Sequence, residues 1–234
     1  MNIYREIGRF TKTHLFSCSI YKIRIDPNSY DKEKILKDIK YNKSLKNRRN
    51  TKQSFKNCDI HYSYNDFDNE DFRSINYEKL IVVYTEIFEE FFNKEIYTTK
   101  SFNWEFCIVN YSAMTEGQWL PSHGHLGSAD PHSGHMTTAF ACIHYLNFKD
   151  GHSFTCFNNP ATFAPFLKYI RPEMYNILDM VPDNSYFWEY VDFPVEEDDM
   201  LIFPSAINHE VPVQGPTKEP RITISTNLMM KEVA

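Results

Sequence analysis

Beyond residue 100 the chain consists mainly of short apolar and β-branched segments that are separated by turn residues. The segments span residues 104–111, 140–148, 153–157, 200–203 and 221–228. Several short strands joined by loops are typical of a β-sandwich or barrel. We therefore expect a mostly β protein with flanking helices, whose core is a double-stranded β-helix, the cupin-like form of the jelly roll.

The first hundred residues mix helical and strand periodicity. Residues 16–25 alternate as a strand does, whereas residues 31–40 and 76–94 predict helices. In the longer helix a stripe of apolar side chains indicates packing on the core rather than a cofactor site. The stripe consists of Leu80, Tyr84, Ile87, Phe88 and Phe91.

These patterns predict one compact domain in two parts. Residues 1–100 are expected to form an N-terminal α/β extension that packs on a jelly-roll core of residues 101–234. The core carries a helical insertion around residues 158–190, with a short helix near residues 163–170. A chain of 234 residues suits this arrangement.

The net charge of −6 argues against nucleic-acid binding driven by bulk charge. The stretch from Lys40 to Lys56 is nevertheless basic, with seven Lys or Arg residues and no acid. Such a run either contacts an acidic or nucleic-acid partner or forms a solvated loop.

Five cysteines without a CxxC pair favour free thiols in a reducing compartment. The sequence shows no secretory signal and no apolar run long enough to span a membrane. We therefore expect a cytoplasmic protein with no membrane partner.

Histidines concentrate in the second half of the chain. Four of the nine lie in the single stretch PSHGHLGSADPHSGH, and neutral imidazole is the commonest protein metal ligand. In an extended chain His123 and His125 point to the same side, since they are two residues apart. His209, in LIFPSAINHEVPV, is well placed to complete a metal site. The alternative is a polar surface loop whose histidines contact only water.

Arg221 opens the strand-like segment RITISTN, in which Thr223 faces the same side. A guanidinium group can hold a carboxylate by two parallel hydrogen bonds, and a neighbouring hydroxyl can add a third. If Arg221 points inward, its charge needs an anionic partner. On the surface, Arg221 would be an ordinary residue of an edge strand.

Taken in order, the segments CIVNYSAMTEGQWLPSHGH, FACIHYLN, DDMLIFPSAINHEVPV and RITISTN resemble 2-oxoglutarate- and Fe(II)-dependent oxygenases of the prolyl-hydroxylase-like group. The arrangement is also similar to small phage-type oxygenases of that superfamily, which would place the protein in the host cytoplasm. The resemblance covers roughly residues 104–228.

The resemblance implies a role for each matching position. His123 and His209 would be iron ligands, and Arg221 with Thr223 would hold the far carboxylate of the cosubstrate 2-oxoglutarate. Tyr145 and Tyr111 would face the cosubstrate, although either is equally explained as a core aromatic. The activity implied is hydroxylation of a protein side chain or small molecule, with release of succinate and CO2.

One position departs from the family pattern His-x-Asp/Glu, because His125 stands where the carboxylate is expected. Four interpretations remain open. His125 is itself the third ligand, which we favour; Asp130 folds back as the carboxylate; the position holds only water, or a halide; or a shifted register brings in His132 or His135. Two other functions also remain: a three-histidine cupin-type metalloenzyme without 2-oxoglutarate, and a catalytically silent jelly-roll binding protein.

Overall fold

The fold was analysed in a computed structural model, which describes residues 4–7, 9–15, 18–45, 60–66, 70–96, 101–125, 137–160 and 189–233. The predicted insertion, with its helix near residues 163–170, lies outside these residues apart from its ends. Asp130, His132 and His135 also lie outside them. None of the described helices is long and apolar enough to cross a membrane.

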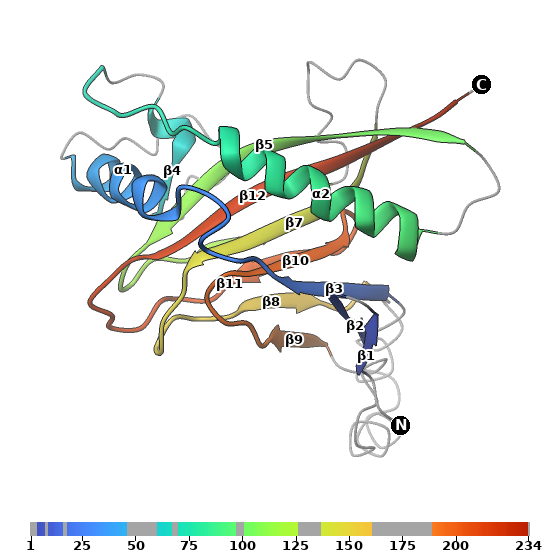
Figure 1. Ribbon diagram of the computed structural model, residues 1–234. Helices are drawn as coiled ribbons and strands as arrows, with labels where there is room; N and C mark the ends of the chain where they lie inside the picture. Colours follow the sequence, from blue (N-terminus) through green and yellow to red (C-terminus); the bar gives the residue numbers. More distant parts are fainter. Residues whose placement is uncertain are drawn as a thin grey trace, which may run out of the picture.

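The described strands form two antiparallel sheets (Figure 1). The larger sheet has eight strands in the order β1-β2-β3-β10-β7-β12-β5-β4. Their bounds are β1 Tyr4–Ile7, β2 Phe10–Leu15, β3 Cys18–Arg24, β10 Asp199–Pro204, β7 Thr137–Asn147, β12 Arg221–Glu232, β5 Phe102–Met114 and β4 His61–Tyr62. The smaller sheet has the order β6-β11-β8-β9, with β6 Leu120–His123, β11 His209–Val211, β8 Thr155–Asn158 and β9 Tyr190–Phe193.

From β5 to β12 the chain winds back and forth between the sheets. β5, β7, β10 and β12 belong to the larger sheet, and β6, β8, β9 and β11 to the smaller one. This winding is that of a double-stranded β-helix, so the predicted jelly roll is confirmed. The N-terminal strands join the same architecture, because β3 pairs with β10 and β4 pairs with β5.

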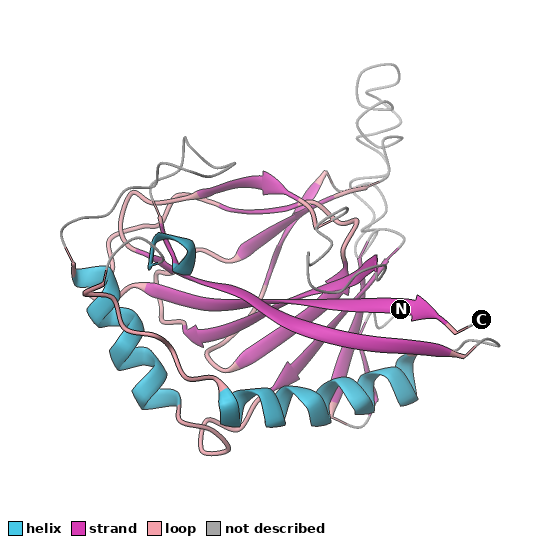
Figure 2. Ribbon diagram, turned by 90° about the horizontal axis from the view of Figure 1, so that it is seen from above, coloured by secondary structure: helices cyan, strands magenta, loops and turns pink. Residues whose placement is uncertain are grey.

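Two helices cover the outer face of the larger sheet, while the smaller sheet lies on its other side (Figures 1 and 2). They are α1, Lys32–Ser44, and α2, Glu78–Glu95; a short 3-10 helix, η1, spans Ser63–Asp66. The predicted stripe of α2 is buried against the sheet, where Phe88 packs on Phe106 and Phe91 on Phe140. Burial of one such ring contributes roughly 1.5–3 kcal/mol, so this layer anchors the sheet from outside.

The basic run begins inside α1. Lys43 is buried, and its ammonium group donates hydrogen bonds to the Ala113 carbonyl and the Gln118 side chain. Lys40 pairs with Glu219 at 2.8 Å. These two lysines therefore hold α1 against the core, while the rest of the run lies outside the described residues and its partner stays a prediction.

Candidate metal and anion site

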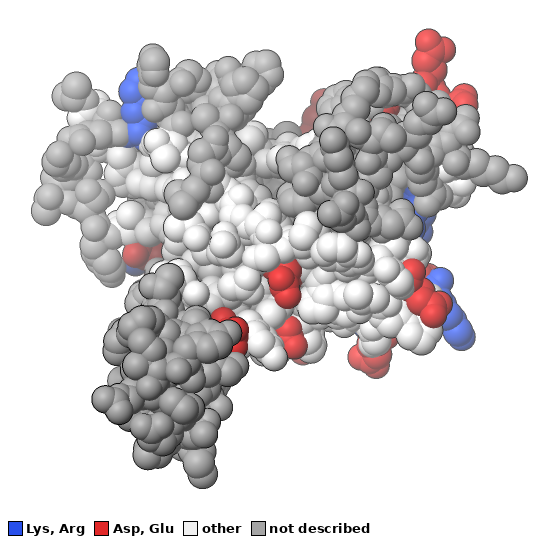
Figure 3. Space-filling model, turned by 180° about the vertical axis from the view of Figure 1, so that it is seen from behind, with Lys and Arg blue, Asp and Glu red and all other residues white. Residues whose placement is uncertain are grey.

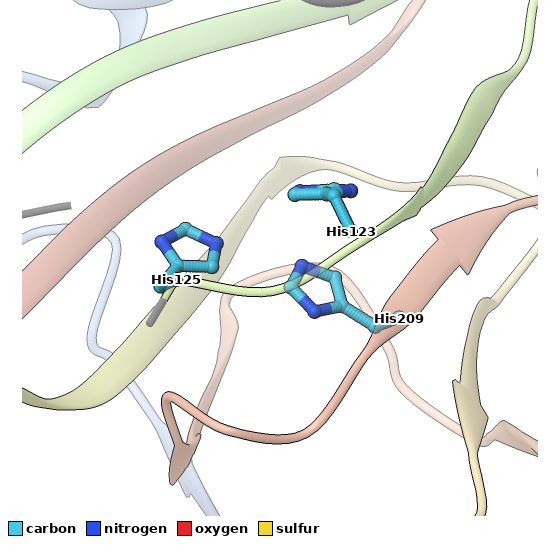
Figure 4. Close-up of side chains that lie close together, drawn as sticks. All are labelled: His123, His125 and His209. Atoms are coloured by element: carbon cyan, nitrogen blue, oxygen red, sulfur yellow. The ribbon is translucent and has the colours of Figure 1, made fainter. Parts of the chain in front are cut away.

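Three histidines meet between the two sheets. His123 ends β6 and His209 opens β11, and the two residues are paired across these strands. His125 lies two residues further along, so its ring reaches the same space (Figure 4). One ligand atom from each side chain lies within 4.8 Å of the other two. The structure thus brings together the three residues that the sequence singled out as metal ligands.

The three rings are oriented by oxygen atoms at their Nδ1 nitrogens. Nδ1 of His123 lies 2.9 Å from the Pro121 carbonyl, Nδ1 of His209 lies 3.3 Å from the Ile207 carbonyl, and Nδ1 of His125 lies 2.8 Å from Oδ1 of Asn227. A carbonyl oxygen only accepts, so the proton resides on Nδ1. The lone pair is then on Nε2, which is the arrangement of metal-bound histidines.

Burial keeps these imidazoles neutral. It lowers the pKa of His123 to about 4, lowers the pKa of His125, and holds the pKa of the almost fully buried His209 well below its usual range. The Pro121 carbonyl partly opposes the effect at His123. Only the neutral form has a lone pair for a cation, so the site is ready to bind a metal at neutral pH.

The position of His125 is set by the backbone as well as by Asn227. Its N–H donates to the Ser205 carbonyl at 2.9 Å, and Ser205 in turn donates to the Thr138 carbonyl at 2.7 Å. The chain passes close to Asn208 here, since a Cβ added to Gly124 would lie 2.7 Å from the Asn208 side-chain oxygen. The turn that presents His125 is therefore closely fitted to its surroundings.

Arg221 is buried with 1% of its surface exposed. Its Nε donates to the Ser153 carbonyl at 3.1 Å, and one terminal nitrogen donates to the Thr155 hydroxyl at 3.0 Å. Burial lowers the pKa of Arg221, and the neighbouring Tyr145 hydroxyl partly opposes this effect. None of its described contacts is a carboxylate. A buried positive charge of this kind is complementary to an anion.

Two of the predicted cosubstrate residues lie beside this guanidinium group. The Thr223 hydroxyl is buried and lies 2.8 Å from the Ser112 hydroxyl. Tyr145 places its ring 5.2 Å from the Arg221 guanidinium carbon and its hydroxyl 2.6 Å from the Thr155 hydroxyl. The group of hydroxyls around Arg221 can add hydrogen bonds to a bound carboxylate.

The histidines and Arg221 share one cavity of about 170 Å³. Its polar lining also includes Asn110, Thr155 and Ser225, which nothing in the sequence distinguished from other strand residues. Its apolar walls come from both sheets and from the segment around β4: Tyr62, Tyr64, Val109, Leu120, Ile143 and Val211. An anion held by Arg221 therefore lies in the same enclosed space as a metal held by the histidines.

The prediction that Tyr111 faces the cosubstrate is wrong. Tyr111 is buried in the core cluster on the helical side of the larger sheet. Its hydroxyl bonds to Asp66, and lies 3.1 Å from both the Asn42 amide and the His61 ring. Neighbours on a strand point to opposite faces, so Asn110 and Ser112 line the cavity while Tyr111 does not.

No protein-family model and no curated protein matches the sequence. Solved structures that resemble the chain include a viral collagen prolyl hydroxylase from Paramecium Bursaria Chlorella virus-1, crystallised as its 2-oxoglutarate complex. It is 12% identical, the match covers 89% of this chain and 95% of that one, and the TM-score is 0.47.

Two others are a Pseudomonas putida prolyl-4-hydroxylase and a 2OG-Fe(II) oxygenase-family protein from Burkholderia pseudomallei. The first is 9% identical, with 92% and 93% of the two chains covered and a TM-score of 0.46. The second is 11% identical, with 88% and 83% covered and a TM-score of 0.44. All three TM-scores lie below 0.5, so the function proposed next is drawn from the site itself.

Proposed function

We propose that this chain is a 2-oxoglutarate- and Fe(II)-dependent oxygenase whose iron is held by His123, His125 and His209. The observation that carries the proposal is Arg221, a buried cation without a described carboxylate contact, in the cavity that the three histidines line. Three neutral imidazoles fit a divalent transition metal, and the guanidinium group fits a dicarboxylate.

In this proposal the residues of the cavity have different roles. The histidines fix the metal on one face and leave its other positions open. Arg221 and Thr223 hold the far carboxylate of 2-oxoglutarate, and Tyr145 supports the guanidinium group. When bound, iron and 2-oxoglutarate supply the oxidation of a substrate C–H bond by O2, with release of succinate and CO2. The apolar walls exclude water from the reacting groups.

His125 is the third ligand in this proposal. Its ring lies within reach of the other two, and both its backbone and its Nδ1 are held by the protein. No carboxylate joins the three histidines in the ligand group formed by the described residues. The metal site is therefore neutral, unlike the two-histidine, one-carboxylate pattern.

Anaerobic titration of the protein with Fe(II) and 2-oxoglutarate tests the proposal. We expect a weak metal-to-ligand charge-transfer band that is lost in His209→Ala and strongly weakened in His125→Ala. His152→Ala is a matched control, because His152 hydrogen-bonds the Glu219 carbonyl and lies outside the cavity lining. Absence of the band, with no succinate formed, would favour a silent binding protein.

A second function has one observation in its favour, namely that all three grouped ligands are histidines. A cupin-type metalloenzyme with such a site needs no 2-oxoglutarate. In that case Arg221→Met would leave both metal affinity and turnover intact. The proposed oxygenase predicts unchanged metal affinity together with a sharply raised requirement for 2-oxoglutarate.

A further inference from the structure

Asn110 lies at the boundary between the metal cavity and a second cavity. It belongs to β5, is 8% exposed, and lines both spaces together with its neighbour Val109. The second cavity has a volume of about 360 Å³ and opens beside η1. Asn110 is therefore in a position to contact a molecule in either cavity.

The amide of Asn110 is only half satisfied. Its Nδ2 donates to the Tyr64 hydroxyl, whereas its Oδ1 is buried with no hydrogen-bond partner. An unsatisfied buried acceptor destabilises the fold, and an apolar side chain of the same shape would avoid that cost. Each such atom in a native structure needs an explanation, and a ligand that donates a hydrogen bond is one.

Among the described residues, the lining of the second cavity combines apolar walls with one carboxylate. Phe72, Ile75 and Tyr77 supply apolar surface, and Asp66 is the acidic residue of its lining. The positive charge in the lining, Arg73, is already engaged. Its guanidinium group pairs with Asp38 at 3.0 Å and lies 3.8 Å from the centre of the Tyr41 ring.

Asp66 is held in place by hydrogen bonds from the protein. Tyr111 and the Asn42 amide both donate to Oδ2, and the His61 ring lies 3.1 Å from Oδ1. Its side chain keeps 16% of its surface exposed, and it lines the second cavity. The carboxylate is thus rigid, partly desolvated and accessible, as a recognition group for a cation requires.

We infer that Asn110 and Asp66 recognise a substrate that carries an amine or guanidine group. The substrate would donate an N–H hydrogen bond to Oδ1 of Asn110 and place its positive charge near Asp66, while an adjoining carbon reaches the metal cavity. Both protein groups are acceptors, so the site favours cationic donors over neutral analogues and rejects anions. This inference rests on the proposed oxygenase function, which supplies the reaction at the metal.

Three probes of one shape and different charge test the inference: benzamidine, benzamide and benzoate. The full chain is loaded with Zn(II) and saturating 2-oxoglutarate, which occupies the Arg221 site, and probe affinity is measured by ligand-observed NMR. We expect benzamidine to bind at least tenfold more tightly than benzamide, and benzoate not to bind. Asp66→Asn should reduce benzamidine to the affinity of benzamide.

The variant Asn110→Leu shows whether Asn110 serves to bind the substrate or to stabilise the fold. We expect it to weaken benzamidine at least tenfold while keeping or raising the midpoint of thermal unfolding, because it removes an unsatisfied buried acceptor. Asn103→Leu, at an exposed position on the same strand, is the matched control and should change neither quantity.

Three results would overturn the inference: equal binding of the three probes, wild-type affinity in Asn110→Leu, or a clear loss of stability in that variant. Binding of 2-oxoglutarate is measured in the same samples by its thermal shift. If 2-oxoglutarate fails to bind but the probe series behaves as expected, the oxygenase proposal fails and the amine site stands. If 2-oxoglutarate binds and the probe series fails, only the amine site is rejected.

Discussion

Replacing Arg221 with methionine separates the stability of the fold from the binding of an anion. Arg221 is 1% exposed, and its hydrogen bonds go to the Ser153 carbonyl and the Thr155 hydroxyl rather than to a carboxylate. Replacing a buried ion pair by apolar residues is often neutral or stabilising by about 1–4 kcal/mol, and Arg221 has no described ion-pair attraction to lose. We therefore expect Arg221→Met to keep or raise the free energy of unfolding of the ligand-free protein.

The same substitution removes the guanidinium group that would hold the carboxylate. Loss of one partner of a buried, hydrogen-bonded charge pair costs about 2–5 kcal/mol. That loss corresponds to a dissociation constant for 2-oxoglutarate that is about 30- to 4,000-fold higher. Metal affinity should not change, because the three histidines are untouched. Stability and ligand affinity are thus expected to respond differently to one substitution.

Thermal unfolding of the Zn(II)-loaded protein measures both effects. At 100 times its dissociation constant, 2-oxoglutarate should stabilise the wild-type protein by about 2.7 kcal/mol. For a chain of this size the midpoint should rise by roughly 5–11 °C. At the same concentration the shift in Arg221→Met should be at most roughly 3 °C.

Arg9→Met is the control for loss of an arginine, since Arg9 is exposed and pairs with Glu90 at 3.5 Å. It should retain the full thermal shift with 2-oxoglutarate. The reasoning is refuted if Arg221→Met shows the wild-type shift. It is also refuted if the ligand-free variant loses several kcal/mol, because Arg221 would then be a structural residue.

Three further substitutions test the surroundings of the site and the fold. Asn227→Leu removes the acceptor at Nδ1 of His125 and should weaken Zn(II) binding about 10- to 100-fold in a competition titration. Thr226→Val, at the preceding residue, is the control and should leave Zn(II) affinity unchanged. Equal affinities of the two variants would contradict the role of Asn227. Lys32→Met leaves the partly buried Asp198 carboxylate without its ammonium partner, whereas Glu197 keeps Lys149. We expect it to lower the free energy of unfolding by about 3–5 kcal/mol in urea, and a loss below 1 kcal/mol would be the contrary result. Burial lowers the pKa of His144 to about 3, so the unfolded chain binds more protons between that pH and about 6.5, and stability falls as the pH drops. The loss on acidification from about pH 7 to 5 should be about 2 kcal/mol smaller in His144→Gln than in wild type, and parallel curves would show that His144 does not contribute.

The sequence was sufficient to predict the jelly roll and to single out most of the residues that the structure groups in the candidate site, because both follow from local patterns. The spacing of His123 and His125 and the extended segment that begins at Arg221 each place side chains on one face of a strand. Their partners are far apart in the chain but are brought together by strand pairing, as in the pairing of His123 with His209.

Which side chains of β5 face the cavity could not be predicted in the same way. From Asn110 to Met114 both faces of β5 are buried, and polar side chains stand among apolar ones, so polarity does not tell which face borders the cavity. The pairing of β5 with β12 is also irregular between Ser225 and Thr226. A shift of one residue exchanges the two faces. The family resemblance alone places Tyr111 at the cavity, whereas the structure places Asn110 and Ser112 there.

The sequence also did not predict which of the clustered basic residues are exposed. The basic run predicted a solvated loop or a binding patch, yet Lys43 is buried and paired with neutral acceptors. Over the described part of the face in Figure 3, basic side chains are few and do not form a patch. A run of charges in the sequence therefore does not reveal which of them a helix turns toward the core.

The third ligand determines the charge of the whole cavity. Three imidazoles are neutral, so a divalent cation and Arg221 together give the walls three positive charges, against two negative charges on 2-oxoglutarate. A carboxylate in place of His125 would remove one of those positive charges. We therefore expect His125→Asp to raise the affinity for Fe(II), because the cation gains a charged ligand, and to lower the affinity for 2-oxoglutarate. If His125 ligates the metal, the affinities for Fe(II) and for 2-oxoglutarate must change in opposite directions. Unchanged affinities in anaerobic titration would show that His125 is not a ligand.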